Sequence, residues 1–350
     1  MARDSIVILG AGIIGLDVAL ELSRRGYGSM VTIVAEHLPG DKSINYTSPW
    51  AGGNFSAISG NDVNALKWDK AGYLEMWKLV ENESPEARFL AKTKSTEYFD
   101  KSPDADKIKS MSTYLKDLVI LPQQGLPARV EFGITFTTIT INSPAHLEHL
   151  SSLLQTPAYG SIPFLRRRLD SLDAAFLSPG TKIVFNCIGN AAKTLKDVED
   201  PRSYPTRGQV VLVRAPNVQE NIMRHGSGYE TYVIPRPNSG GHVILGGYMQ
   251  KGNSSGDVYD SETQSILART KELFPALGAS TTEVLAVAAG LRPSREGGCR
   301  IESEILSEGR LVVHNYGAGG TGYQAGMGMA MTAVELASES LQKLKTSSLL

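Results

Sequence analysis

A glycine-rich segment near the N-terminus has the residue types and spacing of a pyrophosphate-binding loop. Residues 10–15, GAGIIG, match the pattern G-x-G-x-x-G. In that pattern Gly10 permits a tight turn, Gly12 lets the backbone approach a pyrophosphate, and Gly15 allows a helix to pack closely on a strand. The N–H groups at the start of the helix add donors and a positive dipole. Glu36, which lies 21 positions after Gly15, can accept hydrogen bonds from an adenosine ribose and would repel a 2′-phosphate. These residues predict an adenine dinucleotide other than NADP.

A second glycine-rich segment, residues 314–328 (HNYGAGGTGYQAGMG), lies near the C-terminus. Backbone without side chains can lie flat against a ligand, and the N-terminus of a following helix would face that ligand. A flavin needs such a surface because its O2/N1 edge becomes negative on reduction and is stabilised by amide donors. An NAD-dependent enzyme would continue with alternating strands and helices after the first β-α-β unit, which this chain does not. The two segments together favour FAD over NAD.

Composition limits the other function classes. The 350 residues contain 35 Lys and Arg against 36 Asp and Glu, and a formal net charge of −1 gives no indication of nucleic acid or an anionic membrane surface as a partner. No apolar run reaches the roughly 18 residues of a transmembrane helix. Only two cysteines occur, Cys187 and Cys299, which excludes a disulfide scaffold. His146 and His149 have ligand-like spacing but no Cys or acidic cluster beside them, so no metal site is predicted.

Hydrophobic patterning predicts the elements that must position these residues. Short, apolar, β-branched runs indicate buried strands at 5–9, 30–35, 181–189 and 310–314. Apolar periodicity indicates helices at 13–25, 64–81, 262–274 and 329–345. A strand is predicted at 129–142, and antiparallel strands at 207–214, 231–234 and 242–248. Two further stretches are interpreted without regular structure: residues 95–128 as polar and irregular, and residues 317–328 as a glycine-rich loop.

These elements predict an α/β protein with two interleaved domains. A Rossmann-like FAD-binding domain, whose G-x-G-x-x-G loop lies in a β-α-β unit, is expected from residues 1–55, 143–195 and 285–350. An α+β substrate-binding domain, built on a mostly antiparallel sheet, is expected from residues 56–142 and 196–284.

Five motifs occur in order along essentially the whole chain. They are GAGIIGL at the N-terminus, SPWAGGNF at 48–55, TYVIPRP at 231–237, AGLRP at 289–293 and HNYGAGGTGY at 314–323. In these motifs the chain resembles the D-amino-acid oxidases and looks most similar to the fungal ones. The resemblance implies a non-covalently bound FAD and hydride transfer from the Cα of a D-amino acid to flavin N5. Water then hydrolyses the imino acid to a 2-oxo acid and ammonia, and O2 takes the electrons to give hydrogen peroxide.

The resemblance also implies a substrate site. Arg292 would anchor the substrate carboxylate, which a guanidinium can bind in a planar, bidentate way, and the Tyr232 hydroxyl would reach the same carboxylate. Gln324 and Asn54 would lie beside the flavin and the substrate. No residue is assigned as a general acid or base, because a substrate with a neutral amine needs none.

The pocket beside these residues departs from the family pattern. Fungal relatives have GG-x-Y where this chain has Gly246-Gly247-Tyr248-Met249, and alternation along a strand would turn the displaced Tyr248 to the opposite face. Met249 is therefore the predicted pocket residue, and it stays open which tyrosine, Tyr248 or Tyr229, completes the pocket, if either does. An apolar thioether cannot compensate a second buried carboxylate, so neutral D-amino acids are the expected substrates. The alternatives are a D-aspartate oxidase, a glycine or sarcosine-type amine oxidase, and a non-catalytic dinucleotide-binding regulator.

For FAD, the resemblance implies contacts from residues spread along the chain. They are Gly10, Ala11, Gly12, Ile13, Ile14, Gly15, Glu36, Thr47, Ser48, Ala51, Gly52, Gly53, Asn54, Leu169, Ile188, Gly189, Arg292, Gly317, Gly320, Gly322, Tyr323 and Gln324.

The C-terminal tripeptide Ser348-Leu349-Leu350 resembles the S-K-L peroxisomal signal but lacks its basic middle residue. A peroxisomal location is expected, with the cytoplasm as the alternative. The expected partners are a neutral D-amino acid and O2, without nucleic acid or membrane, and the sequence is compatible with a homodimer.

Overall fold

The structure, a computed structural model, describes residues 5–226, 229–278 and 280–347. The chain forms two compact units: unit 1 is Met1–Pro49, Leu147–Tyr204 and Pro293–Leu350, and unit 2 is Trp50–His146 and Pro205–Arg292. Each unit is therefore assembled from separate stretches of sequence. Relative to the predicted domain boundaries, residues 50–55, 143–146 and 285–292 lie in unit 2, and residues 196–204 lie in unit 1. The tripeptide at 348–350 lies outside the described residues.

Unit 1 is built on a six-stranded sheet with the order β14-β15-β7-β1-β2-β6. Its strands are β1 (Ile6–Leu9), β2 (Val31–Ala35), β6 (Phe164–Arg166), β7 (Ile183–Asn186), β14 (Arg300–Ile305) and β15 (Leu311–Tyr316). Every neighbouring pair is parallel except β14 with β15. The side chains of β1, β2, β7 and β15 are all buried, and these strands are mostly apolar in sequence, as strands covered on both faces are. Their buried polar residues are Thr32, Asn186, His314 and Asn315. The four buried strands predicted from the sequence are confirmed.

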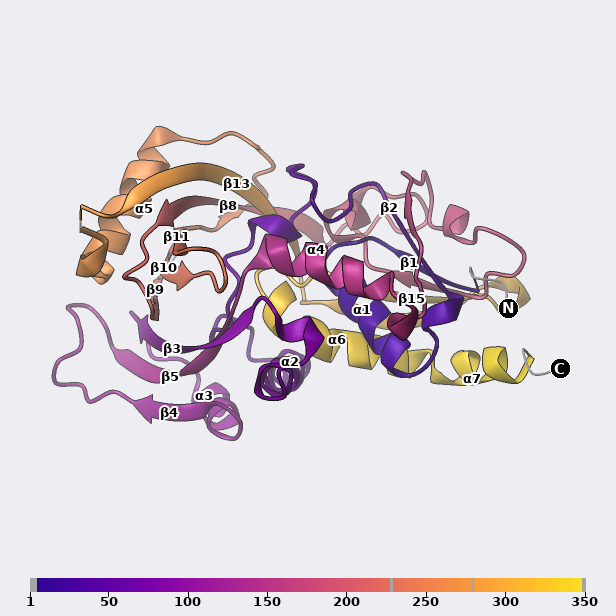
Figure 1. Cartoon of the computed structure of the whole chain (residues 1–350), viewed down its shortest axis with the longest axis horizontal. Helices are drawn as coiled ribbons and strands as arrows, with labels where there is room; N and C mark the ends of the chain where they lie inside the picture. Colours follow the sequence, from indigo (N-terminus) through magenta and orange to yellow (C-terminus); the bar gives the residue numbers. More distant parts are fainter. Residues whose placement is uncertain (1–4, 227–228, 279, 348–350) are drawn as a thin grey trace. The chain divides into compact units, whose positions relative to one another are not determined.

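The helices of this part of the chain are α1 (Ile13–Arg24), α4 (Ser143–Leu154), α6 (Gly322–Leu336) and α7 (Ser338–Ser347). Helices α1 and α6 pack side by side (Figure 1). The prediction of a loop over 317–328 is wrong in its second half, because α6 begins at Gly322. Glycine in this stretch serves helix packing: a Cβ at Gly326 would overlap the carboxylate of Asp17 on α1.

Unit 2 is built on a nine-stranded sheet with the order β12-β8-β11-β10-β9-β3-β5-β4, and β13 pairs with β8. Its strands are β3 (Leu90–Phe99), β4 (Lys116–Ile120), β5 (Phe132–Ile141), β8 (Ser203–Arg214), β9 (Asn221–Gly226), β10 (Tyr229–Pro235), β11 (His242–Tyr248), β12 (Gln250–Lys251) and β13 (Glu283–Arg295). Along the order from β12 to β4, neighbouring strands are antiparallel except β9 and β3, which are parallel. Its helices are α2 (Val63–Glu81), α3 (Ala105–Ser112) and α5 (Asp260–Leu273).

One prediction for this unit is wrong. Residues 95–128 are not irregular, because they contain the end of β3, α3 and β4. In β3 the buried positions include Thr93, Ser95 and Glu97, so the usual apolar alternation is hidden. Arg292 lies within β13.

The two faces of the unit 2 sheet carry different cores. On one face Val211, Val233 and Leu245 pack with Ile266 of α5, and α5 lies against β10 and β11 (Figure 1). On the other face Tyr232 packs with Met223, Ile234 and Ile244. Side chains of β10 and β11 therefore either point to α5 or share a face with Tyr232.

None of the helices in the described parts of the chain has the length and apolar character that a membrane span requires.

Candidate active site

The G-x-G-x-x-G loop of unit 1 joins β1 to α1 and is shaped by close backbone contacts. Gly10 has φ +110°, and a Cβ there would overlap the carbonyl oxygen of Cys187. A Cβ at Gly15 would overlap the carbonyl oxygen of Gly10, so the first turn of α1 lies directly on the loop. Gly12 is the N-cap of α1 and supplies no side-chain cap. Within the first turn, Ile13 N donates to Ser48 Oγ, and the other N–H groups at this end of α1 can face an anion, as a pyrophosphate site requires.

Other residues predicted for FAD lie at the same edge of the unit 1 sheet. Strands β7, β1 and β2 are parallel neighbours, so their carboxyl ends meet there. Ile188 and Gly189 follow β7, and Glu36 follows β2 directly. The Glu36 side chain is 51 % exposed, with Arg168 Nη1 3.8 Å away, so its carboxylate remains accessible to a ribose. Leu169 is buried in the core of this unit.

The segment at Thr47 and Ser48 ties α1 to α6. Ile13 N donates to Ser48 Oγ at 3.0 Å, and Tyr323 Oη donates to the Ser48 carbonyl oxygen at 3.1 Å. Thr47 Oγ1 accepts a hydrogen bond from Asn190, which follows β7. The first turn of α6, including the buried Gln324, therefore lies close to the pyrophosphate loop.

In unit 2 the structure brings Arg292 and Tyr232 together. Arg292 donates a hydrogen bond to the Tyr232 hydroxyl, and its Nη1 also donates to the carbonyl oxygen of Tyr248 at 3.0 Å. Space for the guanidinium exists because residue 208 is glycine: a Cβ at Gly208 would overlap Arg292 Nη1. Burial raises the pKa of Tyr232, and the Arg292 charge offsets this in part. The hydroxyl is neutral near pH 7 and can donate to a carboxylate.

The aromatic candidates Tyr229 and Tyr248 lie on the α5 side of the sheet. Tyr248 packs against the core formed with α5, and the Tyr229 hydroxyl donates to Asp100 Oδ2 at 2.6 Å. The guanidinium of Arg269 on α5 lies 5.7 Å from the Tyr229 ring and 5.4 Å from the Tyr248 ring. Neither ring shares the face of Tyr232. Met249 follows β11 and is 48 % exposed, so it stays a candidate for contact with the substrate side chain.

The residues predicted at 51–54 lie in unit 2 and contact the Tyr232 face. A Cβ at Gly52 would lie 2.7 Å from Ile234 and 3.7 Å from the Tyr232 ring. Asn54 Nδ2 donates to Met223 Sδ at 3.2 Å.

Met223 is the residue of this face that the sequence analysis missed. It is buried, packs against Tyr232 and pairs with it across β9 and β10. The pairing of Met223 with Tyr232 could have been predicted if residues 221–226 had been recognised as strand β9.

A charged cluster lies beside these residues in unit 2. The His225 ring is held between two carboxylates, with Nε2 2.8 Å from Glu97 Oε2 and Nδ1 2.7 Å from Glu230 Oε2, and it stacks on Phe99. Burial alone would lower the pKa of His225, but hydrogen bonds and charge from Glu230 and Glu97 outweigh it and raise the pKa to about 9. His225 is therefore a cation at neutral pH.

The raised pKa of His225 predicts a pH dependence of stability. An unfolded histidine has a pKa near 6.5, so the stabilising contribution is full below about pH 6.5 and is lost as the pH rises through about 9. We expect the free energy of unfolding to fall by on the order of 3 kcal/mol over this interval, and the H225Q variant to lack that part of the fall. Urea denaturation at a series of pH values measures both. An unchanged pH slope in H225Q would contradict the assignment.

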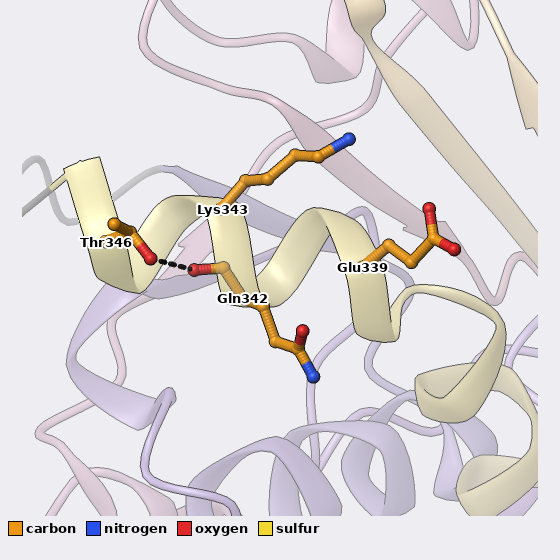
Figure 2. Close-up of a pocket in the computed structure, with 4 residues that line it drawn as sticks. All are labelled: Glu339, Gln342, Lys343 and Thr346. Atoms are coloured by element: carbon orange, nitrogen blue, oxygen red, sulfur yellow. Dashed lines mark hydrogen bonds between the residues drawn. The ribbon is translucent and has the colours of Figure 1, made fainter.

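Two other features of the described residues do not form a site. Residues 5–226, 229–278 and 280–347 contain no group of three or more His, Cys, Asp or Glu side chains arranged to hold a metal ion. Figure 2 shows a hollow along α7 lined by Glu339, Gln342, Lys343 and Thr346, where Thr346 Oγ1 donates to the Gln342 carbonyl oxygen. These four side chains are exposed and lie along about two turns of a single helix, so they form no enclosed site.

The chain is similar to a family of known proteins and to individual named members of it. Residues 164–336 match the family described as FAD dependent oxidoreductase (DAO). The chain is 43 % identical over 351 residues to a D-amino-acid oxidase from Schizosaccharomyces pombe, covering 98 % of this chain and 97 % of that protein. It is 32 % identical to a D-aspartate oxidase from Cryptococcus neoformans, covering 95 % and 96 %.

Among solved structures, an L-proline dehydrogenase from P. horikoshii aligns with a TM-score of 0.76 at 16 % identity, covering 97 % of this chain and 94 % of that one. This likeness shows the fold, an α/β fold with a mostly parallel sheet in one unit and a mostly antiparallel sheet in the other.

Proposed function

Because the chain belongs to the D-amino-acid oxidase family of FAD-dependent oxidoreductases, we propose that it oxidises neutral D-amino acids to 2-oxo acids, ammonia and hydrogen peroxide. The observation that carries the proposal is the Arg292–Tyr232 pair. A guanidinium and a neutral phenol hydrogen-bonded to each other on one sheet face form a binding site for a carboxylate.

The residues of unit 1 fit FAD. The loop has glycine at positions 10, 12 and 15, and the N-cap residue of the following helix supplies no side-chain cap. Together with the accessible Glu36 carboxylate, these features match the pyrophosphate and ribose of the cofactor. When bound, FAD supplies the acceptor for the hydride from the substrate Cα and passes the electrons to O2.

The side chains of this protein contribute orientation rather than proton transfer. Arg292 uses one N–H on the Tyr248 carbonyl oxygen and one on Tyr232, which leaves further guanidinium donors for the substrate carboxylate. The Tyr232 hydroxyl adds a donor to the same carboxylate. With the carboxylate fixed at two points, the Cα–H bond has a defined direction, and a substrate with a neutral amine requires no general base.

The preference for neutral side chains rests on two methionines. Met223 packs beside Tyr232, and Met249 follows the strand that carries Gly246 and Gly247. Neither thioether can pair with a second carboxylate, whose burial without a partner is costly. A D-aspartate oxidase is the alternative, and the similarity to the Cryptococcus neoformans protein makes it the appropriate comparison.

Anaerobic mixing tests the substrate class. We expect the apparent second-order rate constant of flavin reduction, followed as loss of flavin absorbance, to be about 100-fold higher with D-alanine than with D-aspartate. The reason is that the side-chain carboxylate of D-aspartate would be left unpaired in the site. L-alanine is the control for stereochemistry. Faster bleaching by D-aspartate would overturn the neutral preference, and no bleaching by any of the three would overturn the oxidase proposal.

The remaining proposals concern location and assembly. The S-L-L C-terminus and the peroxide-producing reaction support a peroxisomal location, with the cytoplasm as the alternative. The partners would be the amino acid and O2, without nucleic acid or membrane, and the assembly a monomer or a homodimer.

A further inference from the structure

Arg269 on α5 holds two neighbouring strands of unit 2 from the face opposite to Tyr232. Its Nη1 donates to the Glu230 carbonyl oxygen at 3.1 Å and to Thr231 Oγ1 at 2.5 Å, and its Nη2 donates to the Gly247 carbonyl oxygen at 3.1 Å. Nε donates to Ser265 at 3.3 Å. Across the part of the chain that the structure describes, Arg269 has no carboxylate partner. The guanidinium instead faces the backbone carbonyl oxygens of the two strands and the rings of Tyr229 and Tyr248.

These acceptors belong to an irregularity between β10 and β11. Tyr229 pairs with Tyr248 and Tyr232 pairs with Gly246, so two residues of β10 lie opposite Gly247 alone. Such a bulge disrupts the ladder of backbone hydrogen bonds and leaves carbonyl groups in need of donors. The guanidinium of Arg269 supplies donors on both strands at this point.

The same bulge carries both groups that bind the carboxylate. The Tyr232 ring lies over Gly246 and Gly247, where a Cβ would overlap the ring or lie 2.7 Å from its hydroxyl. The Arg292 guanidinium is fixed to the carbonyl oxygen of Tyr248, the residue after Gly247. A shift of the 246–248 segment would therefore move Tyr232 and Arg292 together.

From these contacts we propose that Arg269 is a positioning residue for the substrate carboxylate, which it serves by fixing the bulge under Tyr232 and Arg292 without touching the substrate. This inference rests on the proposed function, because it assumes that Tyr232 and Arg292 bind the carboxylate.

The attachment of α5 to the sheet does not depend on Arg269. Ile266 is fully buried in the core with Val233 and Leu245, and Leu267 and Phe274 pack on the same core. Removing the guanidinium should leave the helix docked and change the bulge.

The experiment compares R269A and R269K with the control R214A. Arg214 is in the same unit, but its side chain is 52 % exposed and pairs only with Glu283 among the described residues. In R269A we expect the KM for D-alanine and the calorimetric Kd for propionate, a carboxylate without an amine, to rise together about 10-fold. The value of kcat should change less than about twofold, because the loss affects carboxylate binding in ground state and transition state alike.

Two further measurements use the R269K variant and guanidinium chloride added to R269A. R269K should keep part of the defect, because an ammonium cannot span both strands with a planar fork. Millimolar guanidinium chloride should lower the propionate Kd of R269A and leave that of R214A unchanged. Should R269A fail to fold, R269K and T231V, which removes one acceptor, carry the test with a smaller rise in the propionate Kd.

Wild-type values of both KM and propionate Kd in the Arg269 variants would overturn the proposal. So would a fall in kcat and thermal stability with an unchanged propionate Kd, since that is the pattern of a purely structural residue. Failure of the wild-type protein to oxidise D-alanine would count against the proposed function instead. Propionate binding would still test Arg269, because it needs no turnover.

Discussion

Replacing Arg292 with leucine is expected to lower kcat/KM for D-alanine by about 1,000-fold while the protein keeps its FAD. Leucine removes the charge that faces the substrate carboxylate, and a carboxylate left without its partner in a buried site costs roughly 3–5 kcal/mol. The hydrogen bonds from Arg292 to Tyr232 and to the Tyr248 carbonyl are lost as well. Steady-state kinetics and the ratio of flavin to protein absorbance measure the two parts of the prediction.

The matched variants for this prediction are R292K and R214L. Lysine keeps the charge but loses the bidentate geometry, so R292K should fall between the wild type and R292L. R214L removes an exposed arginine whose ion pair with Glu283 is on the surface, and it should behave as wild type. Retention of near wild-type turnover in R292L would remove Arg292 from the carboxylate site.

The unit 1 site was predictable from the sequence because its signals are local. A buried parallel strand is rich in apolar residues, and each of β1, β2, β7 and β15 contains a short apolar run that marks it. The pyrophosphate loop needs glycine at fixed offsets from one strand and one helix, so the six residues 10–15 define it. The N-terminus of α6 was placed too late, because glycine and alanine look like a loop unless the close approach of α1 is known.

The unit 2 site was predictable only in part, because its geometry depends on pairing between distant residues. Strand β3 buries Thr93, Ser95 and Glu97, and no apolar alternation marks it. Without β9, the contact of Met223 with Tyr232 could not be inferred. Side-chain alternation along β11 does predict that Tyr248 lies away from Tyr232. The bulge between β10 and β11, and the contacts of Arg269 with it, become visible only in the pairing of these two strands.

The second large effect is expected from G15A, which should weaken FAD binding by at least about 100-fold. The new Cβ would overlap the Gly10 carbonyl oxygen and lie 3.4 Å from the Ile8 side chain. Both neighbours are fixed, since Gly10 N donates to the Val34 carbonyl oxygen and Ile8 is fully buried. Helix α1 must therefore move away from the loop, which displaces the amide donors that face the pyrophosphate; donors to a charged group contribute roughly 1.5–3 kcal/mol each.

Fluorescence quenching on titration of the apoprotein with FAD measures this Kd. The control is G60A, because Gly60 is exposed and a Cβ there would lie 3.3 Å from only the end of the Asp62 side chain. Circular dichroism and thermal unfolding of the apoproteins separate loss of the cofactor site from loss of the fold. If G15A is folded and binds FAD as tightly as G60A, then the loop tolerates a side chain at this position. In that case close packing of α1 on the loop is not what holds the cofactor.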